Sequence, residues 1–253
     1  MNASISVVCP TFGRVRCLEE VIQCFLQQNY DGPKELVILN DYYDQHLIYN
    51  HPEITIINQN EQITPLSKKY NKLISYTKYD YIAVFEDDDK YLKNHLTYAM
   101  NHLIDGSAFR NGLGLVHTGV GQPLHKSGNY FFSSHVFSKK LFEKIGGFEE
   151  KPIDNCTFDV DFISKITREV GNYAHGPKLD DIEFIYAWGN GHYHGSGLGT
   201  HTSTMSKTVS GFVEQQKSAG RIPTGKIILN PHWNEDYEQM KQKFISENQN
   251  GTT

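Results

Sequence analysis

Four consecutive acids follow an apolar run in this sequence: residues 81–85 read Tyr-Ile-Ala-Val-Phe, and residues 86–89 read Glu-Asp-Asp-Asp. The apolar run predicts a buried strand, with four carboxylates at its carboxyl end. Neighbouring carboxylates repel one another by about 1 kcal/mol or more at intermediate dielectric. A divalent cation is the simplest way to hold them, because Mg²⁺ and Mn²⁺ prefer hard oxygen ligands and keep positions open for phosphates. This strand end therefore predicts a metal-bridged diphosphate, as in nucleotide-sugar chemistry.

Strand and helix patterns alternate through the first half of the chain. Apolar runs predict strands over residues 5–8, 36–39 and 54–57, and helical spacing predicts helices over 15–26 and 67–76. Such alternation is typical of an α/β fold with a mainly parallel sheet covered by helices on both faces. Ligands of these sheets bind beyond the carboxyl ends of the strands. We therefore expect Thr11, Asp41 and residues 86–89 to converge on one crevice.

The second half of the chain is less regular. Strand patterns occur at residues 113–117 and 130–132, and helix patterns occur at 138–145, from 159 through 166, and at 234–247. Residues 188–201 are rich in Gly, His and Ser, which predicts a loop.

Composition limits the class of protein. A chain of 253 residues with 38% hydrophobic content can form one large domain and a tail. The net charge of -5 gives no sign of a nucleic-acid binder, although a local basic groove is compatible with it. The four cysteines lack CxxC and zinc-ligand spacing, so we expect reduced core residues. Without a signal-peptide pattern or a run of about 18 apolar residues, we expect a soluble cytoplasmic protein without integral membrane association.

Several ordered blocks resemble the family 2 glycosyltransferases of the GT-A fold. Residues 6–14 resemble that family's first strand and loop, 35–41 its second strand with a terminal Asp, 85–89 its metal-binding acids, and 146–150 with 158–162 its acceptor-side block. Asn71-Lys72 falls where the family has Arg-Asn-Lys, but Tyr70 replaces the Arg. Phe158 likewise stands at a family Glu position. The resemblance covers roughly residues 4–200 and rests on the order and spacing of the blocks together.

The resemblance implies a GT-A, Rossmann-like, mainly parallel sheet flanked by helices. It assigns residues 1–200 to the catalytic domain, with a nucleotide-sugar-binding half at 1–100 and an acceptor-binding half at 101–200. Residues 201–253 would be a C-terminal extension that packs on this domain, with flexible last residues. The implied activity is metal-dependent, inverting transfer of a sugar from a nucleotide-diphosphate donor, with UDP as the expected nucleotide and Mn²⁺ or Mg²⁺ as cofactor.

The resemblance also implies roles for single residues. Asp41 would accept a hydrogen bond from the base, but an aspartate at this point can equally be a turn or helix-cap residue. Lys68 or Lys69 would stand in for the missing Arg near the diphosphate. The expected donor-binding residues are Pro10, Thr11, Phe12, Arg14, Asp41, Lys68, Lys69, Asp87 and Asp88, and the expected metal ligands are Asp89, Asp87, His194 and His192.

Asp159 is the candidate general base. In this role its carboxylate takes the proton of the acceptor hydroxyl as that hydroxyl attacks the anomeric carbon, in one in-line displacement. The alternative is that Asp159 caps the helix that follows, since Asp is favoured there. Asp161 could be the cap instead.

His192 and His194 lie in the glycine-rich segment. Imidazole is a common metal ligand, but alternating histidines can also form one face of a strand. The flanking glycines would let this segment close over the donor and exclude water.

The acceptor is left open by the sequence. A glycan is the expected acceptor, and a hydroxymethylated pyrimidine in phage-type DNA is the alternative. Lys207, Lys217, Arg221 and Lys226 make a modestly basic tail that would serve DNA phosphates or simply be solvated surface. Two other classes compete: a sugar-phosphate nucleotidyltransferase, whose Gly-rich triphosphate loop is missing here, and a catalytically inactive sugar-nucleotide or glycan-binding module.

Overall fold

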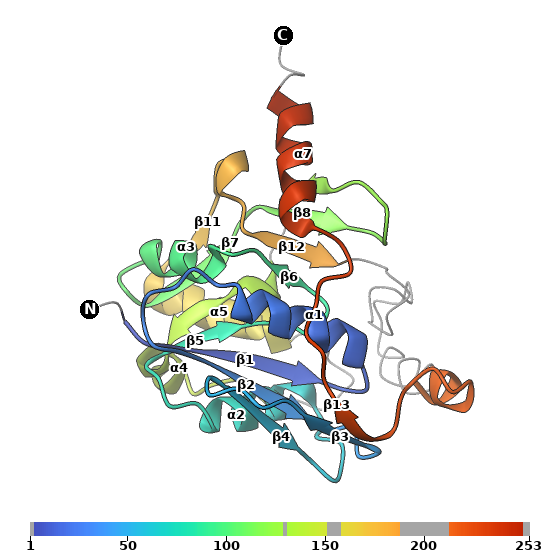
Figure 1. Cartoon of the computed structure of the whole chain (residues 1–253). Helices are drawn as coiled ribbons and strands as arrows, with labels where there is room; N and C mark the ends of the chain where they lie inside the picture. Colours follow the sequence, from blue (N-terminus) through green and yellow to red (C-terminus); the bar gives the residue numbers. More distant parts are fainter. Residues whose placement is uncertain (1–2, 129–130, 151–157, 188–212, 250–253) are drawn as a thin grey trace.

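The structure is a computed structural model that describes residues 3–128, 131–150, 158–187 and 213–249. Its centre is a seven-stranded sheet with the strand order β11-β7-β10-β5-β1-β2-β4 (Figure 1). The strands are β1 (Ile5–Thr11), β2 (Lys34–Asn40), β4 (Ile54–Asn58), β5 (Tyr81–Val84), β7 (Ala108–Asn111), β10 (Val136–Ser138) and β11 (Ala174–His175). Strands β4, β2, β1 and β5 are parallel, and β10 runs antiparallel to β5 and β7.

Helices cover both faces of this sheet, as predicted. Successive side chains of a strand point to opposite faces, and Val7 packs with α1 (Val15–Leu26) and α3 (His95–Asn101). Its neighbour Val8 packs with α2 (Leu66–Ser75), α4 (Lys139–Lys144) and α5 (Phe158–Val170) on the other face. All seven residues of β1 are buried, which explains why its apolar residues point to both faces of the sheet instead of alternating with exposed polar ones.

A second, four-stranded sheet follows the acidic residues directly. Its order is β6-β12-β8-β9, with β6 (Lys90–Tyr91), β8 (Gly114–His117), β9 (His125–Ser127) and β12 (Phe184–Ala187). A parallel pair joins β3 (Gln45–Ile48) to β13 (Gly225–Ile228) of the C-terminal segment. The described chain ends in α7 (Tyr237–Gln249), which extends beyond the second sheet (Figure 1). The division into residues 1–200 and 201–253 stays a prediction.

One predicted strand is wrong. The described part of residues 130–132 contains no strand: it leads into a short 3-10 helix, η1 (Phe132–Ser134), and a second one, η2 (Leu179–Asp181), precedes β12. The Ser134 hydroxyl donates to the Phe131 carbonyl at 2.9 Å, and a His135 ring nitrogen lies 2.6 Å from the Phe132 carbonyl. Local side-chain bonds of this kind favour a turn over a strand.

A further helix prediction is confirmed within the described residues. The helix predicted at 138–145 is α4, and the Ser138 hydroxyl accepts the Leu141 N–H at 3.2 Å as its N-cap. Cys9, Cys17 and Cys24 are buried and are not joined in a disulfide among the described residues. Cys156 and the predicted loop at 188–201 lie outside the described residues. In the described part of the chain, no helix has both the length and the hydropathy needed to cross a bilayer.

Candidate functional site

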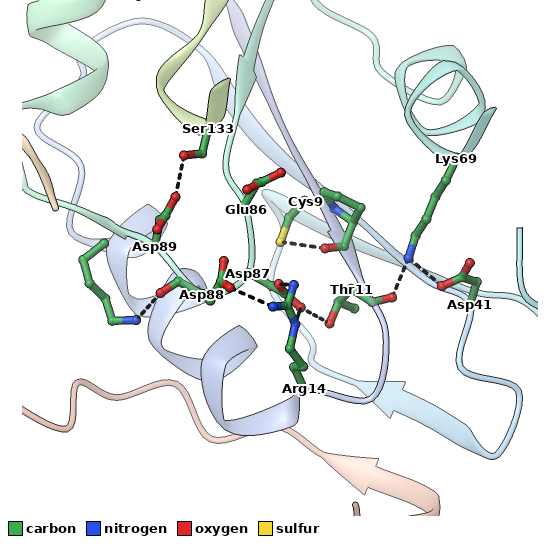
Figure 2. Close-up of polar contacts among 12 residues, drawn as sticks. Cys9, Thr11, Arg14, Asp41, Lys69, Glu86, Asp87, Asp88, Asp89 and Ser133 are labelled. Atoms are coloured by element: carbon green, nitrogen blue, oxygen red, sulfur yellow. Dashed lines mark hydrogen bonds and ion pairs between the residues drawn. The ribbon is translucent and has the colours of Figure 1, made fainter. Parts of the chain in front are cut away.

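The carboxyl ends of β1, β2 and β5 meet at one edge of the central sheet, as the sequence predicts. Thr11 ends β1, and its hydroxyl donates to Asp87 Oδ2 at 2.6 Å, although the two residues are 76 positions apart. Asp41 follows β2 and is joined to Thr11 through Lys69 (Figure 2). The three segments therefore form one connected polar network.

Arg14 supplies a positive charge to the acidic run from within the chain. Its Nε lies 3.1 Å from Asp87 Oδ2, and its Nη1 lies 2.7 Å from Asp88 Oδ2, so the guanidinium bridges the two carboxylates (Figure 2). Charge-assisted bonds of this kind are strong when water is largely excluded, and the Arg14 side chain is 16% exposed. Asp87 and Asp88 therefore have a balancing positive charge from within the chain itself.

Glu86, Asp88 and Asp89 form a group that could hold a metal ion. One ligand oxygen from each lies within 4.8 Å of the others. Burial, followed by the charge of Asp88, raises the pKa of Glu86 to about 8, and the same two causes raise the pKa of Asp89 well above its usual range. Nearby positive charge thus does not fully balance these carboxyl groups. Buried acids that lack balancing charge and offer hard oxygen ligands fit Mg²⁺ or Mn²⁺.

Two of the three acids, Glu86 and Asp89, are held by neighbours on different elements. Tyr70 of α2 donates its hydroxyl to Glu86 Oε1 at 3.1 Å. Ser133 donates to Asp89 Oδ2, and the Ala187 N–H at the end of β12 donates to Asp89 Oδ1 at 2.8 Å. These contacts orient the carboxylates while leaving oxygen lone pairs for a ligand.

The geometry gives Asp87 and Glu86 different surroundings. Asp87 was expected among the metal ligands, but its carboxylate faces Thr11 and Arg14. Glu86, for which the sequence suggested no metal role, lies with Asp88 and Asp89 instead. The Asp89 N–H donates to the Glu86 carbonyl at 3.4 Å, so residues 86–89 turn rather than extend. The only sequence feature that indicated a metal role for Glu86 was its position in the acidic run. The assignment of Asp87 as a metal ligand stays a prediction.

Lys69 and Asp41 form a buried ion pair at the ends of β1 and β2. Lys69 Nζ lies 2.5 Å from Asp41 Oδ1 and 2.7 Å from the Thr11 carbonyl, and Asp41 Oδ2 accepts the Ile63 N–H at 2.8 Å. Burial lowers the pKa of Lys69, and the charge of Asp41 opposes that shift. Lys68, the other expected cation, is exposed. Of the two lysines, Lys69 is the one joined to the site, and its contact with a base or diphosphate stays a prediction.

Lys69→Met is expected to lower the free energy of unfolding by about 3 kcal/mol, because removing one partner of a buried ion pair leaves the other charge uncompensated. Urea denaturation at neutral pH measures the change. Lys68→Met, on the same helix but exposed, is the matched control and should change stability by less than about 0.5 kcal/mol. Equal losses in the two variants would contradict a structural role for the pair.

Aromatic side chains line the same sheet edge. Pro10 is buried within β1, and Phe12 lies edge-on to Tyr42 with 5.0 Å between ring centroids. Val213 and Ile222 of the C-terminal segment pack in the same cluster. The sequence reasoning did not single out Tyr42; its position directly after Asp41 was the available signal.

Asp159 lies in the first turn of α5, where both roles considered for it are compatible with the geometry. Its Oδ1 accepts the Val160 N–H at 2.8 Å, a first-turn N–H that has no intrahelical partner, so the bond is a capping contact although Asp159 is the second residue of α5 and not its N-cap. Burial raises the pKa of Asp159. The neighbouring Phe158 ring lies 5.9 Å from the ring of Tyr70, and Tyr70 bonds Glu86. The start of α5 is thus connected to the acidic group through one aromatic contact.

His192 and His194 lie outside the described residues. The described chain before them ends at Ala187, which bonds Asp89. Their role as metal ligands stays a prediction.

Comparison with known proteins gives a family match and several similar folds. Residues 6–158 match the family described as Glycosyl transferase family 2. No curated protein matches the chain. A mannosyltransferase from Pyrobaculum calidifontis, solved with GDP-Man and Mn²⁺, is similar with a TM-score of 0.53 and 15% identity, over 87% of this chain and 76% of that one.

Staphylococcus aureus TarS is also similar. Its full chain gives a TM-score of 0.51 with 13% identity, over 73% of this chain and 36% of TarS, so the present chain corresponds to about a third of that protein. TarS residues 1–349, solved with UDP-GlcNAc, give a TM-score of 0.50 with 11% identity, over 85% and 73% of the two chains. At these identities the likeness shows a shared fold, namely a mainly parallel sheet flanked by helices.

Proposed function

The chain belongs to glycosyl transferase family 2, and from this premise we propose that it is a metal-dependent, inverting transferase that moves a sugar from a UDP-sugar to a glycan hydroxyl. The observation that carries this proposal is the group formed by Glu86, Asp88 and Asp89 at the carboxyl end of β5, beside the ends of β1 and β2. Sheets of this type bind their ligands at that edge.

Glu86, Asp88 and Asp89 would hold the divalent cation. Their ligand oxygens lie within 4.8 Å of one another. Burial and the charge of Asp88 raise the pKa of Glu86 and of Asp89, so a cation beside these two carboxylates would relieve an unfavourable negative charge. A cation bound there would supply positive charge for the diphosphate that leaves the sugar. Mn²⁺ and Mg²⁺ are the candidates, and the similar mannosyltransferase was solved with Mn²⁺.

Within this proposal Asp159 is the group that accepts the proton of the acceptor hydroxyl. Burial raises its pKa from the usual value for an aspartate, which makes it a better proton acceptor once ionised. Attack by the activated hydroxyl on the face opposite the leaving diphosphate inverts the anomeric carbon. This role uses one carboxylate on the acceptor side, as the sequence predicts.

UDP is the proposed donor nucleotide, and a GDP-sugar is the main competitor. The two similar structures were solved with UDP-GlcNAc and with GDP-Man. A glycan remains the proposed acceptor, because two of the four basic tail residues that suggested DNA have local partners, and Lys207 lies outside the described residues. Lys217 pairs with Asp44, and Arg221 donates to Gln216 at 3.1 Å.

A thermal-shift panel of UDP- and GDP-sugars, each with and without Mn²⁺, tests the proposal. A ligand present at 100 times its dissociation constant stabilises the native state by about 2.7 kcal/mol. We expect the largest rise in Tm with a UDP-sugar, and only when Mn²⁺ is present. A rise with a GDP-sugar would replace the donor, and no rise with any sugar nucleotide would contradict the proposal.

A further inference from the structure

The C-terminal segment contacts helix α1, which is linked to the acidic residues through Glu20 and Lys90. Glu20 of α1 is 4% exposed, and its Oε1 accepts the Asn234 N–H and the Tyr237 hydroxyl, each at 2.9 Å. Trp233 lies next to the same helix, with its indole Nε1 3.3 Å from Cys24 Sγ. Residues separated from α1 by more than 200 positions are thus bonded to it in the interior.

Lys90 joins this contact to the acidic run. It directly follows Asp89, is 2% exposed, and its Nζ lies 2.9 Å from Glu20 Oε2. The same Nζ donates to the Asp88 backbone carbonyl at 2.8 Å and lies 5.6 Å from the centre of the Tyr237 ring. One buried ammonium group therefore links the backbone of a candidate metal ligand to α1 and α7.

A second buried ion pair holds the other side of the acidic group. Lys241 of α7 lies 2.7 Å from Glu183 Oε1, with both side chains less than 8% exposed. Glu183 directly precedes β12, and its Oε2 accepts the Asn94 N–H at 3.2 Å. At its far end β12 presents the Ala187 N–H to Asp89. Helix α7 is thus connected to both Asp88 and Asp89.

We propose that residues 233–241, which we call the C-terminal anchor, hold the acidic group in its metal-binding geometry, with Lys90 as the main positioning residue. The inference rests on the proposed function and concerns how the same site is held. A buried ion pair is weak evidence for stability, since an apolar pair of similar volume often stabilises as well. Contacts behind metal ligands, in contrast, commonly change metal affinity by 10- to 100-fold.

Two possible roles of Lys90 predict opposite effects of its removal on Mn²⁺ affinity, so one substitution distinguishes them. If its positive charge acted only through space, Lys90→Met would strengthen Mn²⁺ binding, because a like charge near the cation is removed. If Lys90 positions Asp88, the same substitution weakens binding, because the Asp88 backbone loses its bond. We expect about tenfold weaker Mn²⁺ binding for Lys90→Met.

The experiment is a titration of the full chain with Mn²⁺, followed by electron paramagnetic resonance of the free ion, with urea denaturation of each variant in parallel. Tyr237→Phe removes the hydroxyl bond to Glu20 but keeps the ring beside Lys90, and should weaken binding by about two- to threefold. Lys243→Met is the matched control, because Lys243 is on the same helix and its side chain is 76% exposed.

The outcomes separate the anchor from the proposed function. Wild-type protein that binds no Mn²⁺ contradicts both. Wild-type binding with unchanged or tighter binding by Lys90→Met overturns the anchor alone, even if that variant is less stable. If Lys90→Met does not fold, Tyr237→Phe decides: binding equal to that of Lys243→Met overturns the anchor, and weaker binding supports it.

Discussion

Asp89→Asn is expected to lower the rate of sugar transfer by about a thousandfold, because a cation that stabilises a leaving group contributes several kcal/mol to the transition state. The loss should be accompanied by weaker Mn²⁺ binding, since an amide is a poorer ligand than a carboxylate. Folding should be preserved, because the Asn oxygen can still accept the Ala187 N–H that now bonds Asp89 Oδ1. Initial rates with a UDP-sugar and a Mn²⁺ titration measure the two effects.

Asp105→Asn is the matched control for this substitution. Asp105 is exposed and has a positive φ of 48°, a conformation that Asn also adopts readily. It should therefore leave transfer and Mn²⁺ binding unchanged. Normal metal binding by Asp89→Asn would remove Asp89 from the ligand set and leave Glu86 and Asp88 without their third member.

Asp159→Asn is expected to lower transfer by about 10² to 10⁴-fold while Mn²⁺ and donor binding stay normal, because a general base contributes a factor of that size. The Asn side chain can still accept the Val160 N–H, so the capping contact is retained. Asp161→Asn, in the same first turn of α5, is the matched control and should retain most of the activity. Near-normal turnover in Asp159→Asn would leave capping as the role of this residue.

The pH dependence of transfer gives a second readout for Asp159. Burial raises the pKa of its carboxyl group, and a general base acts only when it is ionised. The rate should therefore fall as the pH drops through this raised pKa, and the residual rate of Asp159→Asn should lack that acidic limb. An identical limb in the variant would assign it to another group.

The parallel strands were predictable because each contains a short, mostly apolar run that is followed by a polar residue. Strands β1, β2 and β5 and helix α2 lie within a few residues of their predicted positions. The short strands β10 and β12 were missed, since three or four residues carry too little periodicity to separate a strand from a loop. That Thr11, Asp41 and the acidic run lie at one edge of the sheet was predictable from the parallel direction of the strands that they follow.

The amino-acid sequence by itself determined the family, the edge of the sheet where we propose the active site, and the acidic residues at this edge. Tertiary structure alone decided how those acids are arranged: Arg14 contacts Asp87 and Asp88, and Asp88 also lies with Glu86 and Asp89. It also decided that Lys69, rather than Lys68, contacts Asp41, and that a helix at the far end of the chain reaches Lys90. The physical reason is that a sequence shows the periodicity of its apolar residues and the order of its charged ones, which is enough to predict strands and helices. The partner of each buried charge depends instead on distances between segments far apart in the sequence, and only packing fixes those distances.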